Sequence, residues 1–304
     1  MSSAPLSPAS PSLADALTQV QEEIDRRFDL LLAVPDDARA RLYQAMRHAA
    51  IGGGKRLRPL LVFATARLFD VNPEHAGRAA TALEAIHGYS LVHDDLPAMD
   101  NDDLRHGKPT VHKAYDEATA ILAGDCLHAL AFEVLADPAT HPDPAIRAEL
   151  IADLARASGP AGMAGGQMMD LVAENEAFDL GTVTRLQQLK TGALICAAVE
   201  AGAILGRVPA DARTPLRGYA HDLGLAFQIV DDLMDVEGDE ELAGKKLRKD
   251  EAAGKETFVS LLGIERAREQ SRLLVDQAIE HLRHYGEEAD LLRAIARFVV
   301  ERDR

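Results

Sequence analysis

Apolar residues recur three and four positions apart along most of this chain of 304 residues. That spacing is typical of amphipathic helices, and we find no alternation of apolar and polar residues that would indicate a strand. The pattern predicts helices at Leu13–Leu32, Asp37–Ala50, Pro59–Phe69, Pro73–Asp94, Val111–Leu135, Pro144–Ser158, Ala161–Ala173, Leu180–Leu205, Thr214–Val236, Thr257–His284 and Glu287–Val300.

Short connectors with Pro, Asn and Asp join these predicted helices, as at 70–73 and 137–144. No change in composition and no repeat divides the chain into two domains. The Ser- and Pro-rich segment 1–12 lacks the charged and apolar regions of a signal peptide and is typical of a disordered tail. We therefore expect one all-α domain over residues 13–304.

The composition supports helices and excludes several classes of partner. Hydrophobic residues make up 47% of the chain and aromatic residues only 4%, a balance that favours helices over sheets. A net charge of −16 argues against binding to nucleic acid or to an anionic membrane. The longest apolar run, 193–206, contains Glu200 and is too short to span a membrane. Cys126 and Cys196 are far apart and show no zinc or disulfide pattern, so we expect a cytoplasmic location.

A first acidic cluster lies in the segment 89–110, YSLVHDDLPAMDNDDLRHGKPT, at the end of a predicted helix. Its carboxylates are Asp94, Asp95, Asp100, Asp102 and Asp103. Carboxylates at a helix C-terminus face the negative end of the helix dipole, so their placement is locally unfavourable. Pro97 ends the helix and lets Asp100 turn back toward Asp94. By itself, this cluster could be a solvated acidic helix end.

A second acidic cluster, FQIVDDLMD at 227–235, makes a cation the better explanation. At 100° per residue, one apolar stripe comprises Leu216, Ala220, Leu223, Phe227, Val230 and Met234. The adjoining arc comprises Gln228, Asp231, Asp232 and Asp235. Carboxylates next to an apolar stripe repel one another unless a cation is bound, and oxygen ligands without His or Cys suit Mg²⁺. Two such clusters indicate a diphosphate held between them.

Basic residues accompany the acidic clusters along the chain. The segment GGGKRLRP at 52–59 supplies Lys55, Arg56 and Arg58 beside a flexible turn, although it lacks the P-loop pattern and could be an ordinary loop. His87 lies two helical turns before Asp94 on the same face, where a lone His is more often simply packed. The remaining basic residues follow each cluster and could be solvated: Arg105, His106, Lys245, Lys246, Lys249 and Lys255.

Two glycine-containing segments interrupt predicted helices. Lys190-Thr191-Gly192 lies within a long apolar helix, where Gly costs about 1 kcal/mol relative to Ala. This segment predicts a kink that exposes the polar groups of Lys190 and Thr191. In GMAGGQMMD, at 162–170, close helix packing explains the glycines equally well, with Met168 and Met169 as core residues.

Together these segments resemble the trans-isoprenyl diphosphate synthases, most closely their bacterial farnesyl-type members, from Asp37 to the C-terminus. The matching motifs, in order, are GGGKRLRP, an aspartate motif of DDxxxxD form, LAGD at 122–125, GGQ, KTG, and FQIVDDLMD followed by GKK. The resemblance implies an isoprenoid synthase-type helical bundle around a deep central cavity. It also implies a homodimer and about three Mg²⁺ ions per active site.

The resemblance assigns roles to individual residues. The implied Mg²⁺ ligands are Asp94, Asp100 and Asp231, supported by Asp95, Asp232 and Asp235. The residues implied to hold the diphosphate of isopentenyl diphosphate are Lys55, Arg58 and His87. Those implied to surround the allylic diphosphate and its developing cation are Arg105, Lys190, Thr191, Gln228 and Lys245, with Lys255 as a further substrate-binding cation. His106 stands where the family usually has a second Arg, so we expect weaker or more pH-dependent binding of isopentenyl diphosphate.

The implied reaction is an Mg²⁺-dependent condensation of isopentenyl diphosphate with dimethylallyl or geranyl diphosphate, through ionisation, attack on the carbocation and proton loss. Tyr89 lies five residues, about 7.5 Å along the helix axis, before Asp94. In this family an aromatic residue at that position, combined with the two-residue expansion of the first aspartate motif, goes with a fifteen-carbon product. Ser90 is the second residue assigned to chain length. The implied product is therefore farnesyl diphosphate. A geranylgeranyl diphosphate synthase is the alternative within the family.

Three other functions would fit part of the sequence. A phosphohydrolase of the HD type would use His87, His93, Asp94 and a distant Asp, but it leaves the second acidic cluster unexplained. A terpene cyclase would share the first acidic cluster and would need no site for isopentenyl diphosphate. A regulatory subunit of a heteromeric prenyltransferase would keep the fold and lose the chemistry, whereas both acidic clusters are intact here.

Overall fold

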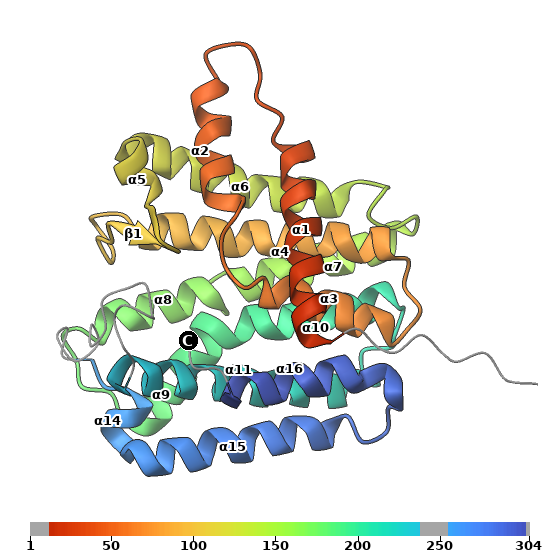
Figure 1. The fold of residues 1–304 in the computed structure, drawn as a ribbon, viewed down its shortest axis with the longest axis vertical. Coiled ribbons are helices and arrows are strands. Elements are labelled where there is room, and N and C mark those ends of the chain that lie inside the picture. Colours follow the sequence, from red (N-terminus) through yellow and green to blue (C-terminus); the bar gives the residue numbers. More distant parts are fainter. Residues whose placement is uncertain (1–11, 238–254, 302–304) are drawn as a thin grey trace, which may run out of the picture.

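The computed structural model describes residues 12–237 and 255–301, and nearly all of its elements are helices (Figure 1). They are α1 (Leu13–Leu31), α2 (Ala40–Ala50), α3 (Leu57–Arg67), α4 (Pro73–Asp94), α5 (Val111–Ala114), α6 (Glu117–Ala136), α7 (Pro144–Ser158), α8 (Met163–Val172), α9 (Leu180–Gln187), the π-helical turn η1 (Gln188–Gly192), α10 (Ala193–Leu205), α11 (Thr214–Glu237), α14 (Phe258–Leu262), α15 (Ile264–His281), the 3₁₀ turn η2 (Glu287–Ala289) and α16 (Asp290–Glu301). The all-α prediction is confirmed. Most of the expected tail, residues 1–11, lies outside the described residues, and Ser12 caps α1.

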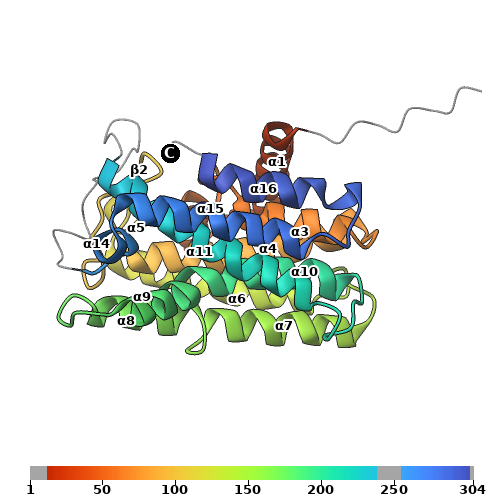
Figure 2. The same cartoon turned by 90° about the horizontal axis from the view of Figure 1, so that it is seen from below.

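The interior of the bundle is formed by α4, α10 and α11. Figures 1 and 2 show these helices between α6 on one side and α15 on the other. The most extensive helix pairs are α11 with α15, α4 with α6, and α10 with α3. A Cβ atom on Gly202 of α10 would lie 2.6 Å from the amide nitrogen of Ala66, so this glycine allows the α3 and α10 backbones to approach closely. The helix that carries the first acidic cluster and the one that carries the second are thus both held in the core.

Several helices begin at caps that the sequence encodes. The Asn72 side chain accepts from the Glu74 amide, and Pro73 occupies the first turn of α4. Asp143 accepts from the Ala145 amide at the start of α7. Such caps satisfy backbone N–H groups that have no partner within the helix, and each contributes about 1 kcal/mol.

Two helices that we expected to be continuous are divided, so these predictions were wrong in extent. The expected helix Val111–Leu135 breaks at Asp116, whose extended backbone (φ −165°) and side chain cap α6. The expected helix Thr257–His284 breaks at Gly263, which separates α14 from α15 with φ +81°. Glycine adopts that left-handed conformation without the steric cost of a Cβ atom.

The expectation of no strands was also wrong, by one small hairpin. Strands β1 (Leu104–Arg105) and β2 (Lys108–Pro109) pair antiparallel, with Arg105 opposite Lys108. The two turn residues, His106 and Gly107, have φ values of 51° and 75°, as a type I′ turn requires. Strands of two residues are too short for an alternating pattern to be visible in the sequence. The hairpin presents Arg105 and His106 directly after the first acidic cluster.

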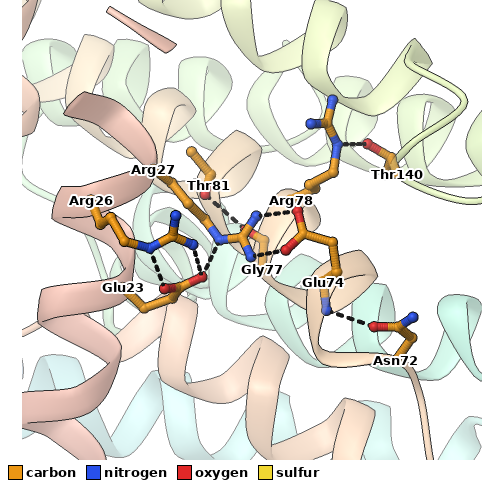
Figure 3. Close-up of polar contacts among 9 residues, drawn as sticks. All are labelled: Glu23, Arg26, Arg27, Asn72, Glu74, Gly77, Arg78, Thr81 and Thr140. Carbon is orange, nitrogen blue, oxygen red and sulfur yellow. Dashed lines mark hydrogen bonds and ion pairs between the residues drawn. The ribbon is translucent and has the colours of Figure 1, made fainter. Parts of the chain in front are cut away.

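A polar cluster fixes α1 across the first half of α4 (Figure 3). Both terminal nitrogens of Arg27 donate to the Glu74 carboxylate, at 2.9 and 2.6 Å, and its Nε donates to Glu23 at 2.6 Å. A Cβ atom on Gly77 would lie 2.5 Å from the guanidinium carbon, so glycine leaves the space that Arg27 occupies. The orientation of α4 is therefore fixed well before its acidic end.

Two helical stretches, Glu117–Ala136 and Leu180–Leu205, are long and apolar enough to cross a membrane by length and composition. The core helices of soluble proteins pass the same test, and 72% of an apolar 18-residue window in the second stretch is buried inside the bundle. Only 39% of the corresponding window in the first stretch, α6, is buried. Packing in the core of this chain therefore does not account for the apolar residues that α6 exposes.

Candidate active site

The chain turns back on itself after α4, as Pro97 predicted. The Asp100 amide donates to the Asp94 carbonyl oxygen at 2.8 Å, and the Asp102 amide donates to that of Asp95 at 3.2 Å. Asp94 is half-buried and Asp100 is exposed. Two carboxylates separated by six positions in the sequence are thus held beside one another at the helix end.

Asp94 lies in a mixed electrostatic environment. Burial raises its pKa to about 6, Lys190 acts in the opposite direction, and the Asp100 charge raises the pKa further. A raised carboxyl pKa means that the ionised form is insufficiently stabilised by the protein alone. Asp94 and Asp100 therefore form an acidic pair whose charge a bound cation would compensate.

Asp95 behaves differently from its neighbour. It is only 3% exposed and accepts from the Arg105 Nε at 3.1 Å. Burial raises the pKa of Asp95, and the hydrogen bond from Arg105 opposes that effect. The Asp102 carboxylate also pairs with Arg105, at 3.4 Å. Asp95 therefore holds the Arg105 guanidinium in place at the edge of the acidic pair.

The second acidic cluster lies on α11, whose apolar stripe is buried as expected at Leu216, Ala220 and Leu223. Asp231 and Asp235 are half-buried, whereas Asp232 is 6% exposed and accepts from the Phe258 amide at 2.8 Å. Asp232 thus anchors the start of α14. Burial lowers the pKa of Arg58, and the charges of Glu84 and Asp231 act against that shift. Asp231 therefore lies close enough to Arg58 of α3 for the two charges to interact.

Two lysines converge on one carboxylate oxygen of Asp170, in α8. Lys190 Nζ donates to Asp170 Oδ2 at 2.8 Å, and Lys255 Nζ donates to the same oxygen at 2.9 Å. The predicted interruption at 190–192 is confirmed as the π-helical turn η1, a feature frequent at functional sites. A Cβ atom on Gly166 would lie 2.2 Å from the Lys190 amide nitrogen, so this glycine lets α8 pack against η1. Sequence reasoning missed Asp170, although it ends the segment GMAGGQMMD.

The three basic residues of GGGKRLRP separate into different roles. Arg56 is 6% exposed and donates to Glu84 at 2.8 Å and to Asp25 at 2.7 Å, so it holds the loop together. Arg58 donates to His87 Nε2 at 3.2 Å. Burial and the Arg58 charge keep the pKa of His87 well below 6.5, so the imidazole is neutral at pH 7. Lys55 is exposed, with its ammonium 5.8 Å from the centre of the Phe298 ring of α16.

His106 lies over the glycine loop. Its ring is 3.3 Å from the position that a Cβ atom on Gly53 would occupy. Burial and the charges of Arg105 and Arg56 lower the pKa of His106, so it contributes no full positive charge at pH 7. His106, which stands where the family usually has a second Arg, thus lies next to the segment that carries Lys55 and Arg58.

The predicted chain-length residues lie on α4, and the Tyr89 ring contacts α6. The Tyr89 ring is perpendicular to the His128 ring at 4.9 Å, and the His93 ring is 5.8 Å away. The Ser90 hydroxyl donates to the His87 carbonyl oxygen at 2.8 Å. Because His93 Nε2 lies 3.1 Å from the Ile121 carbonyl while His87 is bonded to Arg58, the two imidazoles do not share a metal position of the HD type.

The remaining predicted residues are placed as follows. Thr191 is buried within η1, and Gln228 is half-buried on α11, one turn before Asp232. Lys245, like Lys246 and Lys249, lies outside the described residues.

The carboxylates fit Mg²⁺ only in combination with a phosphate ligand. Within residues 12–237 and 255–301, no three His, Cys, Asp or Glu side chains converge closely enough to bind a metal by themselves. Mg²⁺ is usually held by one or two carboxylates together with water and substrate phosphates. The pair Asp94 and Asp100 provides that kind of ligand set, with Lys190 and Arg105 close enough to shift the pKa of Asp94.

A helical bundle that combines an acidic helix end with lysines and arginines in this way defines a class of α-helical enzymes that act on diphosphate esters. The polyprenyl synthetase family model matches residues 39–297. The chain belongs to this family and is a prenyltransferase.

Individual relatives agree with this assignment. The farnesyl diphosphate synthase of Escherichia coli is 46% identical over 86% of this chain and 89% of its own length. A crystal structure described as an FPP/GFPP synthase, from Zymomonas mobilis, is 58% identical, covers 95% of this chain and 98% of its own, and has a TM-score of 0.87. A geranyltransferase from Helicobacter pylori, complexed with magnesium and isoprenyl diphosphate, is 32% identical over 97% of this chain and all of its own, with a TM-score of 0.83.

Proposed function

We propose that this prenyltransferase condenses isopentenyl diphosphate with dimethylallyl and then geranyl diphosphate to give farnesyl diphosphate. The observation that carries the proposal is the return of the chain after α4, which holds Asp100 beside Asp94, where the Lys190 charge acts on Asp94. Relatives named as farnesyl diphosphate synthases, at 40–46% identity over most of the chain, support this product.

The residues divide the reaction between two anionic substrates. Lys190, Lys255 and Arg105 would bind the leaving diphosphate, because charge-assisted hydrogen bonds are the strong ones. Arg58, Lys55 and neutral His87 would orient isopentenyl diphosphate, so that its double bond lies next to the allylic carbon. Thr191 and Gln228 would face the carbocation with their polar oxygens. The proton lost at the end would pass to the departing diphosphate, since the described residues offer no dedicated base at that position.

Mg²⁺ would be held by Asp94 and Asp100 on one side and by Asp231 on the other, with Asp95, Asp232 and Asp235 in supporting positions. When bound, it stabilises the negative charge that develops on the leaving diphosphate. The family is Mg²⁺-dependent, and the magnesium complex of the related geranyltransferase supports Mg²⁺ as the metal here. We propose about three ions per site, the number that the family resemblance implies, with water and substrate phosphates completing the ligands that the carboxylates leave open.

Mg²⁺ affinity is expected to fall with acidification. A metal ligand must be deprotonated, and the pKa of Asp94 lies at about 6 in the metal-free protein. Above pH 7 the carboxylate is ionised, and below pH 6 each pH unit should weaken Mg²⁺ binding by about tenfold. Titration of Mg²⁺ by thermal shift at pH 5, 6, 7 and 8 measures this dependence. Equal affinity at pH 5 and pH 8 would remove Asp94 as a ligand.

Tyr89 is expected to limit the length of the product. It lies five residues before Asp94 on α4, and its ring contacts the His128 ring of α6. Replacing Tyr89 by Ala removes that ring, so products of twenty carbons should appear, whereas Tyr89→Phe should keep the fifteen-carbon product. Mass spectrometry of the products checks both. An unchanged product from the Ala variant would show that another residue ends the pocket.

We also propose that the chain forms a homodimer through α6. Ile121 and Leu122 are 46% and 54% exposed on this apolar helix, and adjacent exposed positions include Ala118 and Ala129. A second copy of the chain would cover this face, as self-complementary interfaces commonly do. Leu122→Lys should shift the mass measured by light scattering from dimer to monomer. Arg26→Ala, at an exposed position of α1, is the control that should leave the mass unchanged.

The test of the function is a product assay with purified protein, Mg²⁺, isopentenyl diphosphate and geranyl diphosphate, with EDTA as control. A metal-dependent fifteen-carbon diphosphate supports the proposal. A longer product would keep the class and overturn the chain length. Hydrocarbon or free phosphate formed without isopentenyl diphosphate would indicate a cyclase or a hydrolase. No reaction would favour a regulatory subunit.

A further inference from the structure

Asp170, Lys190 and Lys255 form a compact cluster in which one carboxylate oxygen accepts from both ammonium groups. Burial acts to raise the pKa of Asp170, but the two lysines outweigh it and hold that pKa below its usual range. Asp170 lies in the last turn of α8, where the helix dipole disfavours a carboxylate. Its ionised form is therefore retained by the lysines, which come from η1 and from the segment before α14.

Both lysines also act on the first acidic cluster. The Lys190 charge lowers the pKa of Asp94, and the Asp100 charge is among those that raise the pKa of Lys255. Without Asp170, Asp94 and Asp100 would be competing partners, since their charges already act on Lys190 and Lys255. Glu174, which is 3.4 Å from Lys255 and exposed, would be a third. Pairing of that kind would neutralise the lysines and the carboxylates together, and would leave neither free for a diphosphate or a cation.

We propose that Asp170 is a positioning residue, which holds the Lys190 and Lys255 ammonium groups together as one anchor for the allylic diphosphate and keeps them from pairing with Asp94 and Asp100. Two ammonium groups against one carboxylate leave the anchor with a net positive charge. This inference rests on the proposed function for the identity of the substrate. It goes beyond that function because it assigns a role to Asp170. This side chain keeps the two ammonium groups apart from the carboxylates of the first acidic cluster.

The experiment compares the native chain with Asp170→Asn and with Glu174→Gln, a matched control that removes the weaker, exposed contact to Lys255. For Asp170→Asn we expect the KM for geranyl diphosphate to rise about tenfold and the Mg²⁺ concentration for half-maximal rate to rise several-fold. The KM for isopentenyl diphosphate should stay within about twofold, because its binding residues lie on α3, on α4 and in the loop before α3. Calorimetry with inorganic diphosphate, in EDTA, should show binding weakened by about tenfold. Glu174→Gln should change each quantity by less than about twofold.

Each result decides between positioning and a general structural role. Equal losses for both substrates, or unchanged or tighter binding of inorganic diphosphate by Asp170→Asn, would overturn the proposal. If thermal unfolding shows that Asp170→Asn does not fold, the same measurements are made on Asp170→Glu. It displaces the anchor by one methylene and should raise only the KM for geranyl diphosphate, and no change would overturn the proposal.

A failure of the proposed function gives a different result. A native chain that does not transfer prenyl groups removes the function. The calorimetric comparison still tests the anchor in that case, because it requires neither turnover nor metal.

Discussion

Replacing Asp94 by Asn will lower kcat/KM by about a thousandfold while leaving the fold intact. The Asn side chain keeps the shape and loses the charge that would bind Mg²⁺, and loss of one group that stabilises transition-state charge costs two to three orders of magnitude. Because burial raises the pKa of Asp94 to about 6, its ionised form is a cost to the metal-free protein at pH 7. In the absence of Mg²⁺, the free energy of unfolding of the variant should therefore equal that of the native chain or exceed it by up to about 3 kcal/mol.

Asp95→Asn provides the matched control one residue away. Asp95 is buried and bonded to Arg105, so its replacement should lower the melting temperature. It should raise the Mg²⁺ requirement much less than Asp94→Asn does, because Asp95 acts on the site through Arg105 and not as a direct ligand. Steady-state kinetics against Mg²⁺ concentration and thermal unfolding in EDTA measure both variants. An Asp94→Asn protein that keeps a tenth of the native activity would show that the metal is bound elsewhere.

The turn after α4 could be predicted because its causes are local. Pro97 cannot continue a helix, and the chain length from Asp94 to Asp100 is enough for one turn back, which the Asp100 to Asp94 hydrogen bond confirms. The interruption at Lys190–Gly192 was predictable for the same reason, since Gly is unfavourable within a helix. In both cases the residue that breaks the helix lies within the segment it shapes.

Roles set by distant partners could not be predicted in this way. Arg56 and Arg58 look equivalent in the sequence, but Asp25 and Glu84, 31 and 28 positions away, make Arg56 structural. Asp170 depends on lysines 20 and 85 positions away. Asp232 is distinguished from Asp231 by a backbone amide 26 positions further on. The spacing of apolar residues predicts which face of a helix is buried. It does not predict which other element packs against that face.

The helix break at Asp116 shows a different limit. Its capping signal is local, with Thr119 three residues later, and the apolar spacing on either side concealed it. The break matters for the site, because α5 and the hairpin together connect the acidic helix end to α6. A search for caps inside long apolar patterns would have found it.

Arg58→Met will raise the KM for isopentenyl diphosphate by about a hundredfold and change the KM for geranyl diphosphate by less than about threefold. The Arg58 guanidinium can make two parallel charge-assisted hydrogen bonds to a phosphate. Neutral His87 holds this guanidinium in place by accepting a hydrogen bond from one of its N–H groups. Arg58→Lys should recover part of the loss, since an ammonium keeps the charge without the bidentate geometry. Initial rates with each substrate varied in turn measure these effects.

Arg56→Met, two residues earlier in the same loop, should fail in a different way. Removing a buried arginine leaves Glu84 without its partner, which costs about 3–5 kcal/mol of stability. That variant should lose melting temperature, and any remaining folded protein should show similar KM values for both substrates. If Arg58→Met instead loses stability and leaves the KM for isopentenyl diphosphate unchanged, the bond between Arg58 and His87 is structural, and recognition of that substrate passes to Lys55 and the glycine loop.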